Sequence, residues 1–128
     1  MKKIVLPFCL LALVSCKKET EEKASLYPEE QKSAKEIELA LGKEIFEGKG
    51  VCYTCHKPEV KTVGPAIMDI AKIYKEKGGS ITEFLQEKSE PIVDPSQYAT
   101  MKTNFAITKN LPEEELKALE AYMLSFSK

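Results

Sequence analysis

Cys52-Tyr53-Thr54-Cys55-His56 brings two thiols and one imidazole together within five residues, and the rest of the chain is interpreted around this segment. Two thiols at this spacing can form thioether bonds to the two vinyl groups of one porphyrin, and the next side chain then lies beside the iron. This C-x-x-C-H pattern is the attachment signature of c-type haem. His56 is the only histidine among the 128 residues. We therefore expect one covalent haem c, held by Cys52 and Cys55, with Nε2 of His56 as a ligand of the iron.

Three other interpretations of the cysteine pair have less support. A redox-active dithiol is typical of a βαβ context, and no strand–helix alternation is visible in the sequence. A closed structural zinc site needs four protein ligands, whereas Cys52, Cys55 and His56 supply three. A disulfide between Cys52 and Cys55 would close a very short loop and would stabilise the fold little.

The beginning of the chain is typical of an export signal. Two lysines precede the apolar run Ile4 to Val14, which is too short for a membrane-spanning helix of about twenty residues and matches the core of a signal peptide. The run ends in Leu13-Val14-Ser15-Cys16, which resembles the lipobox of bacterial lipoproteins. This resemblance implies that residues 1–15 are a lipoprotein signal peptide and that Cys16 is lipidated. An ordinary signal peptide with a coincidental cysteine, or an uncleaved anchor, is the alternative.

The segment after Cys16 is polar and highly charged. Residues 16–32 contain few large apolar side chains, so they cannot bury enough surface to fold, and we expect a flexible tether. Residues 33–128 form the expected folded domain. The whole chain has 19 basic and 20 acidic side chains and a formal charge of −1, which is too balanced for a nucleic-acid-binding protein. We expect a monomer in the cell envelope, on the periplasmic side, held to the membrane by its lipid.

The second ligand of the iron cannot be another histidine, which leaves Met, Lys or an open position. Met68 and Met123 lie in helical patterns and are best explained as core residues. Met101 lies in Tyr98 to Asn104, where we see no helical periodicity, and such a loop could cover the far side of a haem. Ligation by His56 and Met101 would raise the reduction potential and favour electron transfer; the alternative is that Met101 merely packs on the core.

At this point the sequence resembles the small bacterial class I cytochromes c, over about Ser33 to Phe126. The motifs that carry the resemblance occur in order along the chain: Gly42-Lys43-Glu44-Ile45-Phe46, Cys52-x-x-Cys55-His56, Val63-Gly64-Pro65-Ala66-Ile67, Met101 with Asn104, and Leu119-Glu120-Ala121-Tyr122-Met123. The resemblance implies an all-α fold in which about four helices wrap around one haem. It also implies that Gly42 lets the C-terminal helix approach closely and that Phe46 packs against that helix.

The resemblance further implies roles around the haem. The Pro65 carbonyl would accept a hydrogen bond from Nδ1 of His56, which fixes the ring and strengthens the ligand. Ile67 would pack on the haem, Met101 would be the axial methionine, and Asn104 would orient it. The chain also departs from the family, because the approach to Cys52 is longer than in some members and no Trp or Arg is present to hold the haem propionates.

Four segments are predicted to be helical. They are Ser33 to Glu47, Ala66 to Lys77, a short helix that follows the cap at Ser80 and runs through Leu85, and about Pro112 to Phe126. Their apolar residues are expected to form a core that includes the porphyrin.

The expected function is one-electron transfer by a His/Met-ligated haem c in a bacterial respiratory chain, by a carrier and not by an enzyme. Its partners would be redox proteins in the membrane or periplasm. Four lysines could steer docking onto an acidic partner, or could simply be solvated: Lys57, Lys61, Lys102 and Lys109. The alternatives are a haem sensor or enzyme with an open sixth position, and a fixed electron-transfer subunit of a larger oxidase or reductase.

Overall fold

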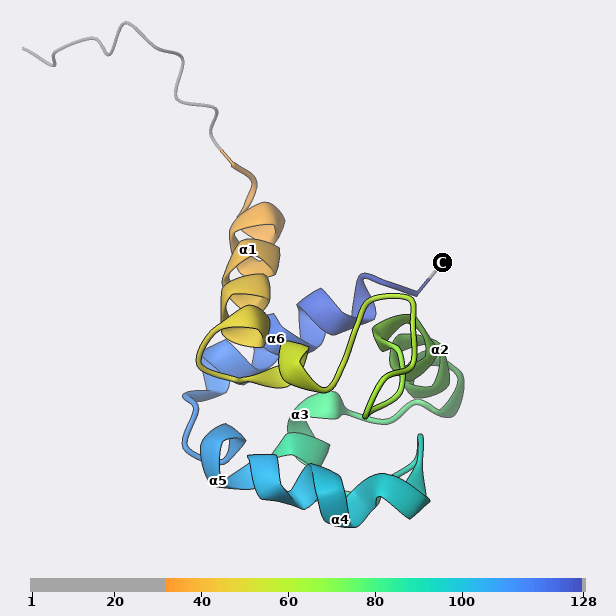
Figure 1. Cartoon of the computed structure of the whole chain (residues 1–128). Helices are drawn as coiled ribbons and strands as arrows, with labels where there is room; N and C mark the ends of the chain where they lie inside the picture. Colours follow the sequence, from red (N-terminus) through yellow and green to blue (C-terminus); the bar gives the residue numbers. More distant parts are fainter. Residues whose placement is uncertain (1–31, 128) are drawn as a thin grey trace, which may run out of the picture. The chain divides into compact units, whose positions relative to one another are not determined.

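The computed structural model describes residues 32–127. The predicted signal peptide (1–15), the Cys16 lipidation site and all of the predicted tether except Lys32 lie outside these residues. Within the described part the chain is all-helical and has no strand, as predicted (Figure 1). None of the described helices is long and apolar enough to cross a membrane.

The four predicted helices are present, with ends that differ by one or two residues. They are α1 (Ala34–Glu47), α2 (Ile67–Lys77), α3 (Ile81–Leu85) and α6 (Glu113–Leu124). Helix α1 begins with a capping box, in which the Ser33 hydroxyl accepts from the Glu36 amide at 3.2 Å and the Glu36 carboxylate accepts from the Ser33 amide at 2.6 Å. At α3, the Ser80 hydroxyl accepts from the Glu83 amide at 3.2 Å. Local polar residues therefore fix where these helices begin.

The first and last helices cross at very short range. A Cβ atom on Gly42 of α1 would lie 2.0 Å from the Ala118 carbonyl oxygen and 2.6 Å from Cβ of Tyr122, both on α6. The ring of Phe46 lies 5.6 Å from that of Tyr122. The expectation that Gly42 permits a close approach and that Phe46 packs on the C-terminal helix is confirmed. In Figure 1, α1 and α6 lie against each other beside the remaining helices.

Helix α3 is held at both ends by side chains from other elements. The Glu120 carboxylate of α6 accepts from the amides of Ile81 and Thr82, at 2.9 and 3.1 Å. At the other end, the Thr108 hydroxyl donates to the Leu85 carbonyl at 2.7 Å. These bonds satisfy backbone groups that a short helix leaves without internal partners.

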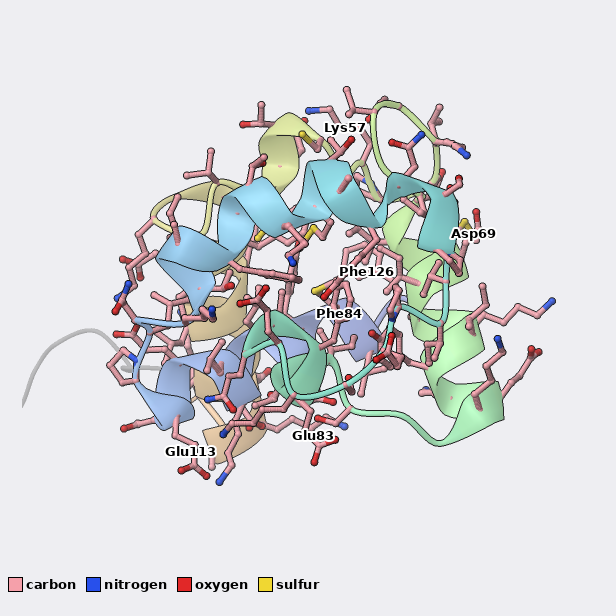
Figure 2. The ribbon with its side chains drawn as sticks, turned by 90° about the horizontal axis from the view of Figure 1, so that it is seen from below. Lys57, Asp69, Glu83, Phe84, Glu113 and Phe126 are labelled. Carbon is pink, nitrogen blue, oxygen red and sulfur yellow. The ribbon has the colours of Figure 1, made fainter. Side chains whose placement is uncertain are left out.

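The core lies between these helices. In Figure 2, Phe84 and Phe126 lie centrally, whereas Lys57, Asp69, Glu83 and Glu113 lie at the periphery. The largest fully buried side chains are Phe46, Phe105, Ile45, Ile67, Ile81, Leu116, Leu119 and Thr108.

The segment that carries Met101 is helical, and the expectation of a loop was wrong. It consists of η2 (Pro95–Gln97), α4 (Tyr98–Met101), η3 (Lys102–Asn104) and α5 (Phe105–Thr108), which follow one another without a break. Tyr98 and Phe105 lie one helical repeat of seven residues apart and their rings are 6.1 Å from each other. The expectation failed because seven residues are too few to reveal a periodicity that becomes clear only when Phe105 is included.

Candidate functional site

The turn between α1 and the cysteines has an unusual backbone. The Gly50 amide donates to the Ile45 carbonyl at 2.8 Å, and Val51 then adopts a left-handed conformation with φ 55°. A β-branched residue in this region is strained. The Gly50 carbonyl accepts from the Cys52 thiol at 3.4 Å and from the Asn104 side-chain amide at 3.1 Å. One carbonyl therefore connects the cysteine segment to the segment that carries Met101.

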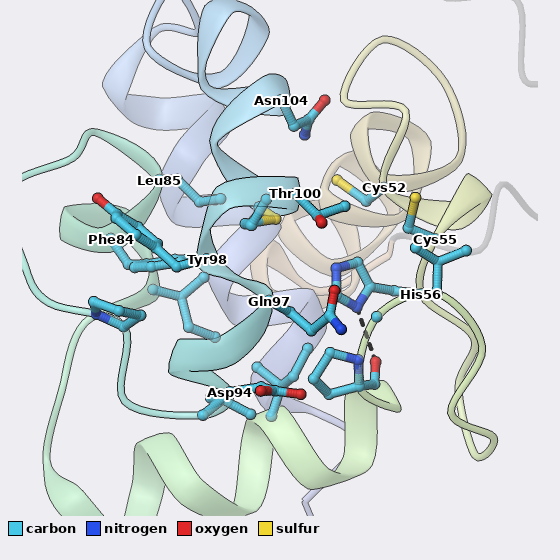
Figure 3. A pocket seen from close by; sticks show the side chains of 18 of the residues that line it. Cys52, Cys55, His56, Phe84, Leu85, Asp94, Gln97, Tyr98, Thr100 and Asn104 are labelled. Atoms are coloured by element: carbon cyan, nitrogen blue, oxygen red, sulfur yellow. Dashed lines mark hydrogen bonds between the residues drawn. The ribbon is translucent and has the colours of Figure 1, made fainter.

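The short helix η1 (Cys52–Thr54) begins at the first cysteine, and Cys55 follows its last residue. Cys55 and His56 both donate their amides to the Cys52 carbonyl, at 3.1 and 2.9 Å, so the three functional residues share one tight turn. Both thiols are free, and Figure 3 shows both sulfurs on the side of the cavity. Burial raises the pKa of the Cys52 thiol to about 11, so it is protonated at neutral pH.

The His56 ring is fixed by the segment that follows it. Its Nδ1 lies 2.8 Å from the Pro65 carbonyl oxygen, as Figure 3 shows. Burial lowers the pKa of the ring and the bond to Pro65 partly opposes this, so the ring is neutral at pH 7 with its proton on Nδ1. Nε2 then keeps a free lone pair, as a metal ligand requires. Gly64 leaves room for the ring, since a Cβ there would lie 2.4 Å from Cε1 of His56.

These residues open onto an apolar cavity of about 270 Å³. This volume is close to the lower end of the range for cofactor sites, roughly 300–1,000 Å³. The segment that carries Met101 also contributes to the lining, through Gln97, Tyr98, Thr100, Met101, Thr103 and Asn104. The lining residues from the helices and turns include Cys52, Cys55, His56, Pro65, Ile70, Tyr74, Phe84, Leu85, Tyr98, Met101, Asn104 and Met123.

Two predicted site residues have surroundings that the sequence did not indicate. Ile67 is buried with 1% exposure but does not line the cavity; Ile70, one turn later on α2, does. Asn104 lines the cavity, and its amide bonds to the Gly50 carbonyl. The roles of Ile67 in packing on a haem and of Asn104 in orienting Met101 remain predictions.

Polar side chains on the cavity wall were missed by the sequence analysis. Tyr74 and Gln97 line the cavity, and Figure 3 shows Gln97 and Thr100 on the side of the α4 segment that faces the cysteines and His56. Burial raises the pKa of Tyr74, so its hydroxyl stays neutral. Gln97, Thr100 and Asn104 follow one another at intervals of one helical turn. Only this spacing could have indicated from the sequence that they share the side of the segment that lines the cavity.

The donor set fits a covalently attached haem. Two free thiols and one unprotonated imidazole nitrogen lie at the edge of a cavity whose walls are mainly aliphatic and aromatic. The zinc alternative lacks a ligand set, because among residues 32–127 no three His, Cys, Asp or Glu side chains gather closely enough to hold a metal ion.

Comparison with known proteins identifies the family. The family model described as Cytochrome c matches residues 39–127, which include the cysteines, His56 and Met101. No curated protein matches the chain.

Proposed function

The chain belongs to the cytochrome c family, and from this premise we propose that it carries single electrons through a haem c that is ligated by His56 and Met101. Members of the family bind haem c covalently, and haem-based electron transfer follows from that membership. The observation that carries the ligand proposal is the 2.8 Å bond between Nδ1 of His56 and the Pro65 carbonyl. It leaves Nε2 available, in a cavity that Met101 also lines.

Each residue of the site has a defined task in this proposal. When bound, the haem supplies an iron(III)/iron(II) couple. Cys52 and Cys55 hold it by thioethers, and the Pro65 carbonyl keeps the His56 ring in one tautomer and one orientation. The Met101 thioether would be the second protein ligand of the iron, and no coordination position would then be left for a substrate. The apolar walls of the cavity would limit the access of water to the iron and so help to set its reduction potential.

Absorption spectra of the purified protein in both redox states test the ligand pair. We expect a low-spin haem c with a methionine–iron charge-transfer band in the ferric form. Met101→Ala should lose this band and lower the reduction potential. Met68→Ala is the matched control, because Met68 is half-buried on α2 and does not line the cavity.

The same preparations separate an electron carrier from a sensor or enzyme. Carbon monoxide should not bind to the reduced wild-type protein and should bind to Met101→Ala. If the wild-type protein binds carbon monoxide readily, or if the charge-transfer band survives in Met101→Ala, the ligand proposal is wrong.

We also propose that the carrier works in a bacterial respiratory chain while held by its lipid to a membrane, on the periplasmic side. The proposal is supported by the lipobox-like Leu13-Val14-Ser15-Cys16 and by the charged segment that follows. Mass spectrometry of the mature protein should find an acylated N-terminal Cys16, and the protein should partition into detergent. Cys16→Ser should abolish both properties; a soluble wild-type protein that keeps residues 1–15 would contradict the anchor.

A further inference from the structure

Glu87 occupies a position at the end of α3 that usually requires glycine. The Lys88 amide donates to the Glu83 carbonyl at 2.8 Å, and the Glu87 amide donates to the Phe84 carbonyl at 3.0 Å. These two bonds form a Schellman motif, in which one residue after the helix is left-handed. That residue is Glu87, with φ 56°, whereas α2 ends on a glycine, Gly78, with φ 68°. Because a Cβ atom disfavours this conformation, a glutamate here weakens the backbone, and its side chain must serve another purpose.

The Glu87 carboxylate holds two lysines of the segment that carries Met101. Lys102 directly follows Met101, and Lys109 directly follows α5, the last helix of that segment. Lys109 forms an ion pair with one carboxylate oxygen, and Nζ of Lys102 lies 3.7 Å from the other. The hydrogen bond from Lys109 lowers the pKa of Glu87, so the carboxylate is ionised at neutral pH. One charge on α3 therefore attaches two points of the segment.

The end of α3 also packs against the same segment. The ring of Phe84 lies 6.2 Å from that of Tyr98 and 5.4 Å from that of Phe105. Nζ of Lys102 lies 5.4 Å from the centre of the Tyr98 ring, so this lysine also contacts an aromatic face. Helix α3 is itself bonded to α6 through the Glu120 carboxylate. The support for the segment is therefore firmly attached to the rest of the domain.

We propose that Glu87 is a positioning residue for the Met101 ligand, because its ion pairs with two lysines keep the Met101 sulfur at the iron. The inference rests on the proposed ligand pair and specifies what keeps that pair intact. Exposed ion pairs contribute little to the stability of a whole domain. Local opening of this segment, however, breaks only the few contacts between the segment and its support, so each of these contacts affects how often the segment opens.

Imidazole binding to the ferric, haem-loaded protein tests this role, because imidazole can bind the iron only after Met101 has left it. Glu87→Gln and Glu87→Gly both remove the charge, and only the glycine also relieves the left-handed backbone. At low salt and neutral pH, we expect both variants to bind imidazole about fivefold more tightly than the wild type. In urea unfolding followed by circular dichroism, Glu87→Gly should be more stable than Glu87→Gln. Retention of the ligand and global stability thus change differently in the two variants.

Two further variants and one change of conditions serve as controls. Glu83→Gln removes an exposed carboxylate from the same helix and should bind imidazole as the wild type does. Lys109→Gln removes a partner of Glu87 and leaves the backbone at residue 87 unchanged, and it should also bind imidazole more tightly. High salt screens exposed charges, so it should strengthen imidazole binding to the wild type and have little effect on the two Glu87 variants.

The possible failures are distinguishable. If Glu87→Gln binds imidazole more tightly but Glu87→Gly does not, residue 87 acts through its backbone alone and the positioning role is wrong. Unchanged affinity in both variants would also overturn it, and either result leaves the electron-carrier function intact. A wild-type protein that lacks the methionine–iron band and binds imidazole as tightly as Met101→Ala would instead refute the ligand pair, and the positioning role with it.

Discussion

Replacing Gly42 by alanine should strongly destabilise the domain, although alanine is the better helix former. The new Cβ would lie 2.0 Å from the Ala118 carbonyl oxygen, and normal contact requires about 3.5 Å. The Ala118 carbonyl belongs to the backbone of α6, and the new Cβ is bonded directly to the backbone of α1, so the two helices would have to separate by roughly 1.5 Å. A radial gap of about 1 Å already loses up to half of the attraction between the facing atoms.

The loss in the free energy of unfolding can be estimated from the side chains that the crossing of α1 and α6 buries. Four side chains of the crossing are almost fully buried: Ile45, Phe46, Leu116 and Leu119. Each contributes roughly 1.5–3 kcal/mol. Losing about half of this and adding strain of roughly 1–3 kcal/mol outweighs the gain of about 1 kcal/mol in helix propensity. We expect a net loss of at least about 3 kcal/mol, which corresponds to a fall in Tm of at least roughly 12 °C for a domain of this size.

Urea unfolding of the haem-loaded protein, followed by circular dichroism, measures this loss. Glu38→Ala is the matched control, because Glu38 is exposed on the same helix, and its free energy of unfolding should change by less than about 0.5 kcal/mol. If Gly42→Ala is as stable as the wild type, α1 and α6 can accommodate a methyl group between their backbones, and the close crossing does not limit stability.

Three further substitutions test other contacts of the fold and the site. Gly64→Ala would put a Cβ 2.4 Å from the His56 ring, so the ring must turn, and the ferric spectrum should show a high-spin fraction; a purely low-spin spectrum would contradict this. Glu120→Gln removes a charged acceptor from the beginning of α3 and should lower the free energy of unfolding by about 1–2 kcal/mol; equal stability at neutral pH would show that the charge is irrelevant. Thr108→Val keeps the volume of a side chain with 0% exposure but leaves the Leu85 carbonyl without its donor. Urea unfolding should again show a free energy of unfolding that is lower by about 1–2 kcal/mol. An unchanged urea midpoint would count against a contribution from this hydrogen bond.

The parts of the fold that sequence could predict are those with local signals. Ser33 and Ser80 mark the beginning of a helix through hydrogen bonds within three residues, and the apolar residues of α2 recur at helical spacing on its buried face. The haem-attachment motif was equally local, because two thiols and an imidazole share one turn. Even the close crossing at Gly42 was anticipated, although only through the resemblance to a family and not from the spacing of residues.

The parts that sequence could not predict depend on contacts between distant residues. Nothing near Asn104 indicates that its amide bonds to the carbonyl of Gly50, 54 positions earlier. Nothing near Ile67 indicates that Ile70 and not Ile67 lines the cavity; the choice depends on how α2 is rotated against α6. The pairing of Lys102 and Lys109 with one carboxylate likewise depends on where the turn after α3 brings Glu87.

The segment that carries Met101 shows why this distinction matters for function. Its helical turns are only three or four residues long, and isolated helices of that length are unstable in water. The segment therefore depends on contacts made elsewhere: the Thr108 hydroxyl on α3, the Glu87 carboxylate, and the Gly50 carbonyl beside Cys52. Regions that are held by few contacts are the first to open locally. These distant partners, and not the sequence around Met101, therefore determine how firmly the Met101 sulfur is held.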